Sequence, residues 1–219
     1  MIFKNILRKF RAILYRLSNC FIRYPTYGED INKKILKTDD PIRYMSMTLA
    51  IKRILFNEIQ GAFAEIGVYK GETSKLICQI APEKRFYLFD TFEGFPEQFI
   101  EKKDDRFKDT SVESIKKKIG GFSNIIIKKG IFPETTKGIE DETFSFVIID
   151  LDLYEPTFLA LEFFYPRITS GGYIFIHDYN NPDESEGAVR KAVDAFSYRI
   201  DEEFIEIPDK WGSVIIRKN

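Results

Sequence analysis

The sequence is poor in the residues that build disulfide frameworks and zinc sites. Its 219 residues include two cysteines, Cys20 and Cys78, and one histidine, His177. Two widely separated cysteines are too few for a disulfide scaffold or for a zinc site. Few cysteines are usual in a reducing compartment, so we expect a cytoplasmic protein.

An excess of charge of one sign is lacking as well. Lys and Arg number 33 against 34 Asp and Glu, which gives a formal net charge of −1. Proteins that bind nucleic acid usually carry a basic excess, so we expect no nucleic-acid partner. No apolar run approaches the roughly 18–20 residues of a membrane-spanning helix. The composition, 44% hydrophobic and 31% charged, is that of a globular protein with one well-buried domain and an appendage.

The first 25 residues differ from the rest of the chain, because basic residues interrupt an apolar pattern with helical spacing and no acid is present. The apolar positions are Phe3, Ile6, Leu7, Phe10, Ile13, Leu14, Leu17 and Phe21, and the basic ones are Lys4, Arg8, Lys9, Arg11, Arg16 and Arg23. One interpretation is a basic amphipathic helix that makes peripheral contact with the inner face of the membrane. The other is a helix that packs on the domain or on a second subunit in a homodimer. We expect residues 26–60 to form a linker and helical cap, and residues 61–219 to form the main domain.

Short apolar runs alternate with helical patterns after residue 61. The predicted strands are 62–68, 85–90, 124–128, 144–150 and 172–177, and the predicted helices lie near 72–80, 111–119, 133–138, 156–168 and 186–199. This alternation predicts an α/β fold with a doubly wound, mostly parallel sheet. The chain ends with two strand-like runs around a short turn, so we expect an antiparallel hairpin at the C-terminal end of the sheet.

Carboxylates end two of the apolar runs. Residues 147–155 read VIIDLDLYE and residues 173–180 read YIFIHDYN, which places Asp150 and Asp152 at one strand end and Asp178 at the other. An ionised carboxylate at the edge of an apolar layer needs a partner or a metal ion. Ligands of open α/β sheets bind at the carboxyl ends of the strands. The pattern therefore predicts a metal or substrate site there.

The turn after the first strand is typical of a nucleotide site. Gly67 and Gly71 let the backbone approach a ligand closely, and the helix that follows offers free N–H groups. Asp90 ends the second strand, where a carboxylate accepts hydrogen bonds from a ribose, although a structural turn and a capping aspartate remain alternatives. Val68 and Tyr69 stand where a dinucleotide-binding turn has its middle glycine, so S-adenosylmethionine is favoured over a nicotinamide cofactor.

Five longer motifs resemble the macrocin-type sugar O-methyltransferases (the TylF/MycF family) of the class I S-adenosylmethionine-dependent enzymes. They are AEIGVYKGETS, LFDTFEGFP (88–96), KGIFPETT (129–136), IDLDLYEPTFLALEFFYPRITSGGY (149–173) and HDYNNPDESEGAVRKAVDAF (177–196). The resemblance runs from Tyr44 to Trp211 and leaves residues 1–43 without a match.

The resemblance implies the class I fold with a Rossmann-like sheet, methyl transfer to a hydroxyl (an enzyme of EC 2.1.1 type), and a divalent cation, usually magnesium. The cofactor-binding positions that it implies are Glu65, Gly67, Tyr69, Gly71, Thr73, Ser74, Asp90, Thr91, Phe92, Gly130, Ile131 and Phe132. The implied metal ligands are Asp150, Asp178 and His177. The family commonly has two adjacent aspartates where this chain has His177 and Asp178, and magnesium prefers oxygen ligands, so the metal at this site is open.

Methyl transfer to an alcohol also requires removal of the hydroxyl proton. A cation held by Asp150 and Asp178 lowers the pKa of that hydroxyl, and a nearby base takes the proton. His177 is the candidate base because its ordinary pKa lies near neutrality, and Asp152 is the alternative base or a third ligand. The expected acceptor is a sugar, glycan or glycosylated natural product. The alternatives are a catechol-like small molecule and a catalytically silent, S-adenosylmethionine-binding partner subunit.

Overall fold

The computed structural model describes residues 31, 34–35, 37–181 and 187–219, so the predicted helix over residues 1–25 lies outside the described residues. The chain divides into two units, Met1–Asp39 and Asp40–Asn219. In the first unit, the Thr38 hydroxyl donates a hydrogen bond of 2.6 Å to the Ile35 carbonyl and closes a turn. None of the helices in the described ranges is long and apolar enough to cross a membrane.

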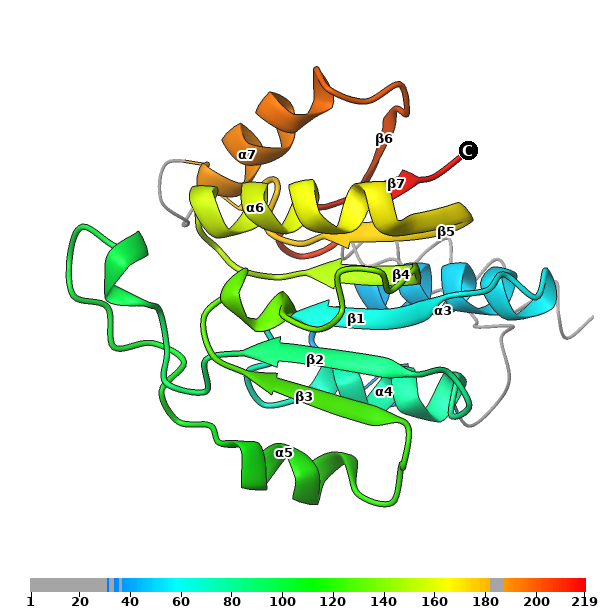
Figure 1. Ribbon diagram of the computed structural model, residues 1–219, viewed down its shortest axis with the longest axis horizontal. Coiled ribbons are helices and arrows are strands. Elements are labelled where there is room, and N and C mark those ends of the chain that lie inside the picture. Colours follow the sequence, from blue (N-terminus) through cyan, green and yellow to red (C-terminus); the bar gives the residue numbers. More distant parts are fainter. Residues whose placement is uncertain (1–30, 32–33, 36, 182–186) are drawn as a thin grey trace, which may run out of the picture. The chain divides into compact units, whose positions relative to one another are not determined.

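The second unit is built from alternating strands and helices (Figure 1). Its elements are α3 (Pro41–Phe56), β1 (Ala62–Ile66), α4 (Glu72–Ile80), β2 (Phe86–Asp90), the 3₁₀ turn η1 (Glu97–Phe99), α5 (Val112–Ile119), β3 (Ile125–Lys129), η2 (Glu134–Thr136), β4 (Phe144–Ile149), α6 (Tyr154–Phe164), η3 (Tyr165–Arg167), β5 (Ile168–Ile176), α7 (Ala188–Ser197), β6 (Phe204–Ile207) and β7 (Ser213–Arg217).

Within the described residues, seven strands form one sheet in the order β3-β2-β1-β4-β5-β7-β6. The first five strands pair in parallel, and β7 is antiparallel to both β5 and β6. This arrangement confirms the predicted doubly wound sheet with its antiparallel C-terminal hairpin. The strands β1 and β4 are buried along their whole length, as expected for parallel strands covered on both faces.

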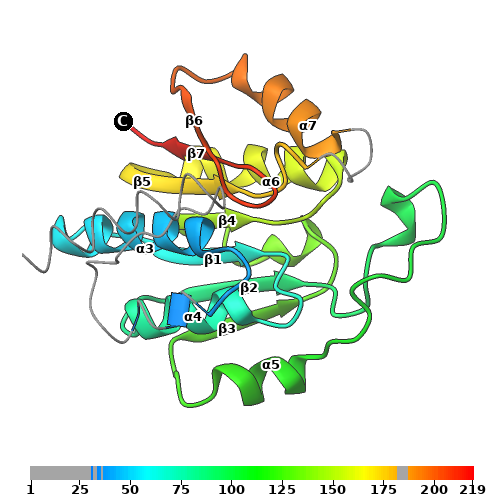
Figure 2. The same ribbon diagram turned by 180° about the vertical axis from the view of Figure 1, so that it is seen from behind.

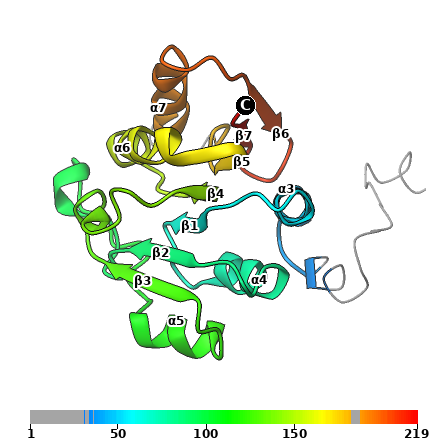
Figure 3. The ribbon, with the colours of Figure 1, turned by 45° about the vertical axis from the view of Figure 1, so that its right-hand side comes forward.

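Helices cover both faces of the sheet. Helices α6 and α7 pack against each other on one face, and α3 and α4 cover the other, as Figures 2 and 3 show from behind and from the side. On the α6 and α7 side, a single apolar cluster joins alternate strand residues to the helices, with Ile66, Ile149, Leu161, Phe164 and Val193 among its members. Burial of the apolar surface between the strands and these helices stabilises the sheet, and the sheet in turn holds the strand ends in place.

Two predicted elements differ from the structure. The helix predicted near 133–138 is the 3₁₀ turn Glu134–Thr136, because β-branched threonines and the glycine at 138 shorten the helical stretch. The strand predicted at 172–177 begins at Ile168, four residues earlier than expected. Gly171 and Gly172 both lie inside the strand, and a Cβ atom on Gly172 would come within 2.9 Å of the Ser145 carbonyl oxygen.

The strand register places the predicted site residues along one edge. Ile66 pairs with Phe89 on one side and with Ile149 on the other, and Ile149 pairs with Ile176. The residues that follow these positions are Asp90, Gly67, Asp150 and His177. They therefore form a row at the carboxyl ends of four neighbouring parallel strands.

Candidate active site at the carboxyl edge of the sheet

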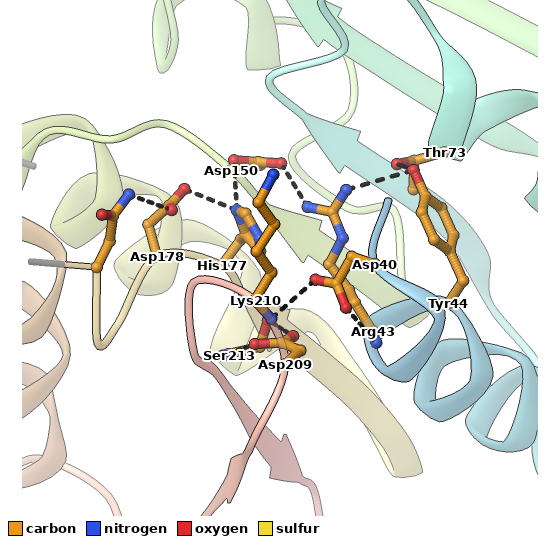
Figure 4. A network of polar contacts seen from close by, with 11 residues as sticks. Asp40, Arg43, Tyr44, Thr73, Asp150, His177, Asp178, Asp209, Lys210 and Ser213 are labelled. Carbon is orange, nitrogen blue, oxygen red and sulfur yellow. Dashed lines mark hydrogen bonds and ion pairs between the residues drawn. The ribbon is translucent and has the colours of Figure 1, made fainter. Parts of the chain in front are cut away.

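Asp150, His177 and Asp178 form a compact cluster at the ends of β4 and β5. One ligand atom from each lies within 4.8 Å of the others. His177 Nδ1 is 2.6 Å from Asp178 Oδ2 and 3.2 Å from Asp150 Oδ1 (Figure 4). The Asn181 side-chain amide donates to the other Asp178 oxygen at 2.8 Å. The structure thus brings together the three residues predicted to bind metal.

The backbone explains why these side chains meet. The His177 amide donates to the Ile149 carbonyl at 2.9 Å, so the β4–β5 pairing continues as far as His177 itself. Asp178 then has φ +61°, in the left-handed region, and the chain turns away from the sheet. Because the strands are parallel and adjacent, their terminal side chains share one edge.

Burial and charge act in opposite directions on the cluster. Burial by itself raises the pKa of Asp150, but the nearby His177 and Arg43 outweigh it and lower that pKa to about 2. Burial lowers the pKa of His177, but Asp150 and Asp178 raise it to about 10. The imidazole therefore carries a proton at neutral pH and bridges two carboxylates. His177 can serve as the predicted base only when it has lost that proton and its free nitrogen does not ligate a cation.

Two further residues of the site come from α3, and sequence reasoning did not identify them. Arg43 Nη1 is 3.3 Å from Asp150 Oδ2, and its Nη2 donates to the Tyr44 hydroxyl at 3.3 Å. The Tyr44 hydroxyl lies 3.1 Å from the Thr73 hydroxyl in the first turn of α4 (Figure 4). A chain of polar contacts thus connects the predicted cofactor loop to the carboxylate cluster. The sequence predicted only a helical cap in this region and carried no signal for this role.

The loop between β1 and α4 follows the shape that its glycines allow. Gly67 has φ +90°, and a Cβ atom there would come within 1.8 Å of the Asp150 carbonyl oxygen. Gly71 has φ +69° and begins α4 without a side-chain cap. The loop therefore lies tightly against the end of β4, and the first turn of α4 keeps its N–H groups free of a capping side chain.

Asp90 holds this loop in place. Its Oδ2 accepts hydrogen bonds of 2.8 Å from the amides of both Val68 and Tyr69, and its Oδ1 accepts one of 2.6 Å from the Phe92 amide. These bonds connect the end of β2 to the turn after β1. Asp90 thus has a structural role, because it holds the turns after β1 and β2 in place. Its role as a ribose ligand stays a prediction.

Glu65 is fully buried beneath the same loop. The Ser74 hydroxyl donates a short hydrogen bond of 2.5 Å to Glu65 Oε2. Burial raises the pKa of Glu65 to about 8, and the hydrogen bond from Ser74 only partly opposes this effect. Glu65 and Ser74 thus connect the end of β1 to the first turn of α4.

The remaining predicted cofactor residues lie beside the end of β2. The Gly130 amide donates to the Asp90 carbonyl at 3.0 Å, so the turn after β3 lies next to Asp90. Phe132 is buried in the apolar cluster, and its ring is 5.8 Å from that of Phe89. Thr91 donates its hydroxyl to the Gly94 carbonyl at 2.6 Å and closes a local turn. Ile131 is half-buried and Phe92 is buried.

Tyr69 connects the predicted cofactor loop to a charged segment, residues 97–110, that follows β2. Its hydroxyl donates to Asp109 Oδ1 at 2.8 Å, and its ring packs edge-on against Phe107 with centroids 5.0 Å apart. The Tyr69 carbonyl also accepts a hydrogen bond from the Thr110 hydroxyl. Tyr69 and residues 105–109 line a hollow of about 490 Å³. The segment before α5 therefore packs against the loop rather than extending into solvent alone.

Four of the turns at this edge contain a residue with a left-handed backbone. Tyr69, Phe92, Asp152 and Asp178 have φ between +46° and +61°, and they follow β1, β2, β4 and β5. Such conformations cost about 1–3 kcal/mol each and concentrate at functional sites. Asp152 is buried but does not belong to the group of three residues whose ligand atoms lie within 4.8 Å of one another. Its role as a base or third ligand stays a prediction.

Comparison with known proteins gives a match over most of the chain. Residues 40–218 match the family model described as macrocin O-methyltransferase (TylF). Among curated proteins, the chain is 24% identical over 163 residues to the 8-demethyl-8-(2,3-dimethoxy-α-L-rhamnosyl)-tetracenomycin-C 4'-O-methyltransferase of Streptomyces olivaceus, covering 66% of this chain and 60% of that protein. It is 21% identical over 156 residues to the demethyldecarbamoylnovobiocin O-methyltransferase of Streptomyces niveus, covering 63% and 60%. The chain thus spans about 60% of the length of both relatives.

A solved structure shares the fold. The O-methyltransferase NovP superimposes with a TM-score of 0.68 at 20% identity, covering 89% of this chain and 90% of that one. This likeness agrees with the mixed seven-stranded sheet and its antiparallel end.

Proposed function

Because the chain belongs to the macrocin O-methyltransferase (TylF) family, we propose that it transfers a methyl group from S-adenosylmethionine to a hydroxyl of a sugar in a natural product or glycan. The observation that carries the proposal is the row of residues at one edge of the sheet. The glycine turn and Asp90 lie at one end of this row, and the carboxylate cluster lies at the other. A methyl donor and an acceptor bound at these two places are neighbours.

The residues around the turn after β1 fit the cofactor. The Gly67 backbone leaves no room for a side chain, and the first turn of α4 has no side-chain cap, so it suits the carboxylate of the amino-acid moiety. Asp90 and the turn at 130–132 flank the place for the adenosine. When bound, S-adenosylmethionine supplies a methyl group on a positively charged sulfonium.

The cluster fits a divalent cation by the convergence of its donors. Asp150 and Asp178 offer carboxylate oxygens, and His177 offers Nδ1. Magnesium prefers oxygen ligands and imidazole suits transition ions such as zinc, whereas Mn²⁺ shares the preference for carboxylate oxygens and stands above magnesium in its affinity for nitrogen ligands. We therefore favour a transition ion such as Mn²⁺ over the Mg²⁺ that the family resemblance implies. A cation bound there supplies a Lewis acid that lowers the pKa of the acceptor hydroxyl.

The side chains of the cluster orient the acceptor and manage its proton. The contacts from His177 to both aspartates and from Asn181 to Asp178 fix the two carboxylates at the strand ends. A fixed carboxylate pair holds a hydroxyl in line with the methyl group without rearrangement during the reaction. Asp152 and His177 remain the two candidates for the base, His177 only if it is unprotonated and does not itself ligate the cation.

The name of one relative supports a glycosylated acceptor, and the name of the other supports a natural product. One relative is named for the 4'-hydroxyl of a rhamnosyl group, and the other for demethyldecarbamoylnovobiocin. The family model covers the whole second unit of this chain except its last residue. These two compounds are therefore the natural first acceptors to test.

A methyl-transfer assay tests the proposal. S-adenosylmethionine with a tritiated methyl group is incubated with the protein, Mn²⁺ and these two acceptors or a glycan extract, and label in the acceptor fraction is measured. We expect incorporation that falls at least 100-fold in Asp150→Ala and upon chelation with EDTA. Asp141→Ala, which removes an exposed acid before β4, is the matched control and should retain full activity. Full incorporation by Asp150→Ala in the presence of EDTA would contradict the metal-assisted mechanism.

A further inference from the structure

Arg43 occupies a place in α3 that helix stability does not explain. It lies in the first turn of the helix, where the positive end of the macrodipole disfavours a cation. Its side chain is only 16% exposed, and its Nε is buried without a hydrogen-bond partner. A buried guanidinium with an unsatisfied donor is costly. The position therefore needs another reason.

The contacts of Arg43 supply that reason. One nitrogen of the guanidinium pairs with Asp150 Oδ2 at 3.3 Å, and another donates to the Tyr44 hydroxyl. The guanidinium carbon also lies 5.0 Å from the centre of the Tyr44 ring. Tyr44 in turn contacts Thr73 at the start of α4. The positive charge of Arg43 is thus held beside Asp150, because the Arg43 side chain is bonded to Tyr44 and Tyr44 contacts Thr73 of α4.

The two oxygens of Asp150 are therefore both in use. Oδ1 contacts His177 Nδ1, and Oδ2 contacts Arg43. A divalent ion at the cluster needs at least one of these oxygens. The guanidinium stays charged at every accessible pH, and it repels a second cation at this distance in a partly buried setting. By Coulomb's law this repulsion corresponds to a tenfold or larger loss of affinity.

We propose that Arg43 is a resident cation of the carboxylate cluster, which balances Asp150 in the absence of a metal and lowers the affinity of the cluster for a divalent ion. The inference rests on the proposed cation site and adds a regulator to it. The residue acts through Asp150 and is a positioning residue. Its attachment to Tyr44 and Thr73 places it between the cluster and the cofactor loop.

Titration of Mn²⁺ into the purified, cofactor-free protein tests this role without any acceptor. Isothermal titration calorimetry, or the electron paramagnetic resonance signal of free Mn²⁺, gives the Kd for the wild type and two variants. Arg43→Gln keeps a hydrogen-bond donor but loses the charge, and Arg43→Met keeps the apolar stem. We expect both variants to bind Mn²⁺ about tenfold or more tightly than the wild type. Arg43→Lys, which keeps the charge, should stay within about threefold of it.

Arg53→Met is the matched control, because it removes an exposed arginine from the last turn of the same helix. Its Mn²⁺ affinity should equal that of the wild type. Circular dichroism tests whether each variant is folded. If Arg43→Met does not fold, the comparison of Mn²⁺ affinity uses Arg43→Gln. Equal Mn²⁺ affinity in all folded variants would overturn the role of Arg43 and leave the cation site intact. A lack of Mn²⁺ binding in every variant would overturn the cation site and this inference together.

Discussion

Two carboxylates at neighbouring strand ends, the half-buried Asp150 and the buried Glu65, have pKa values shifted in opposite directions by their neighbours. Asp150 has Arg43 and His177 beside it, and its pKa falls to about 2. Glu65 has the neutral Ser74 as its hydrogen-bond partner, and burial raises its pKa to about 8. Asp150 is therefore charged at neutral pH, whereas Glu65 holds a proton in the cofactor-free protein.

This proton gives the stability of the protein a pH dependence. The pKa of Glu65 rises from 4.5 in the unfolded chain to about 8 in the folded one, so the folded state binds the extra proton between these values. Its contribution to stability is complete below pH 4.5 and is lost as the pH rises through about 8. Glu65→Gln removes the titrating group. We expect the free energy of unfolding of the variant, relative to the wild type, to increase by a few kcal/mol, as an order of magnitude, from pH 5 to pH 8.

Urea unfolding of both proteins at several pH values in this range measures the effect. Ser145→Ala, a variant of another buried polar residue, controls for the loss of polar contacts in general. Parallel stability profiles for Glu65→Gln and the wild type would show that Glu65 is already charged in the folded protein.

The sequence predicted the cluster residues well because each one follows an apolar run. Asp150 and the pair His177 and Asp178 end strands whose burial is evident from composition alone. Arg43 and Tyr44 could not be found in this way. They lie on a helix, and their contact with Asp150 depends on how α3 packs on the sheet, which the local pattern does not specify.

At the scale of elements, the turn between β1 and α4 decides whether the two halves of the site can meet. Gly67 lies against the backbone of Asp150, and its φ of +90° is unfavourable for any other residue. A side chain here would separate β1 from β4 at the row of site residues. The turn thus determines both the shape of the cofactor loop and the position of the carboxylate.

Gly67→Ala should therefore be strongly destabilising. Its Cβ would lie 1.8 Å from the Asp150 carbonyl oxygen, which a paired strand cannot move away. We expect a loss of more than about 4 kcal/mol in the free energy of unfolding, or failure to accumulate folded protein. Gly138→Ala is the matched control, because it has a similar φ of +84° with nothing within 4 Å of the added atom.

Strain alone should cost the control variant about 1–3 kcal/mol. Urea denaturation of the two variants gives the comparison. Equal destabilisation would mean that the loop moves freely away from β4 and that the tight turn is not required.

The order of the elements was accessible from the sequence, because apolar runs and helical patterns alternate throughout the second unit. The ends of individual strands were harder to predict from the sequence where a glycine allows close packing. The predicted strand began at Gly172, yet β5 begins at Ile168 and includes both Gly171 and Gly172. A Cβ atom on Gly172 would come within 2.9 Å of the Ser145 carbonyl oxygen in β4, so close approach of the two strands excludes a side chain there. Sequence composition alone does not distinguish a glycine that turns the chain from one that allows two strands to approach.

At the scale of the whole second unit, one edge of the sheet carries two separate tasks. The ends of β1 and β2 form the proposed cofactor half, and the ends of β4 and β5 form the proposed acceptor half. Helix α3 contacts both halves: Arg43 contacts Asp150, and Tyr44 contacts Thr73 of α4. The acceptor itself is not specified by these residues, because specificity in such folds depends on loops and on terminal segments.

This division of labour is the central claim, and the binding of S-adenosylhomocysteine to three proteins tests it most directly. Isothermal titration calorimetry compares the wild type with Asp90→Ala and Asp150→Ala. Asp90 accepts three backbone hydrogen bonds that hold the loop, so its loss should weaken binding at least tenfold. Asp150→Ala should bind within about threefold of the wild type, because its carboxylate belongs to the other half. Unchanged affinity in Asp90→Ala, or a collapse of affinity confined to Asp150→Ala, would contradict the account.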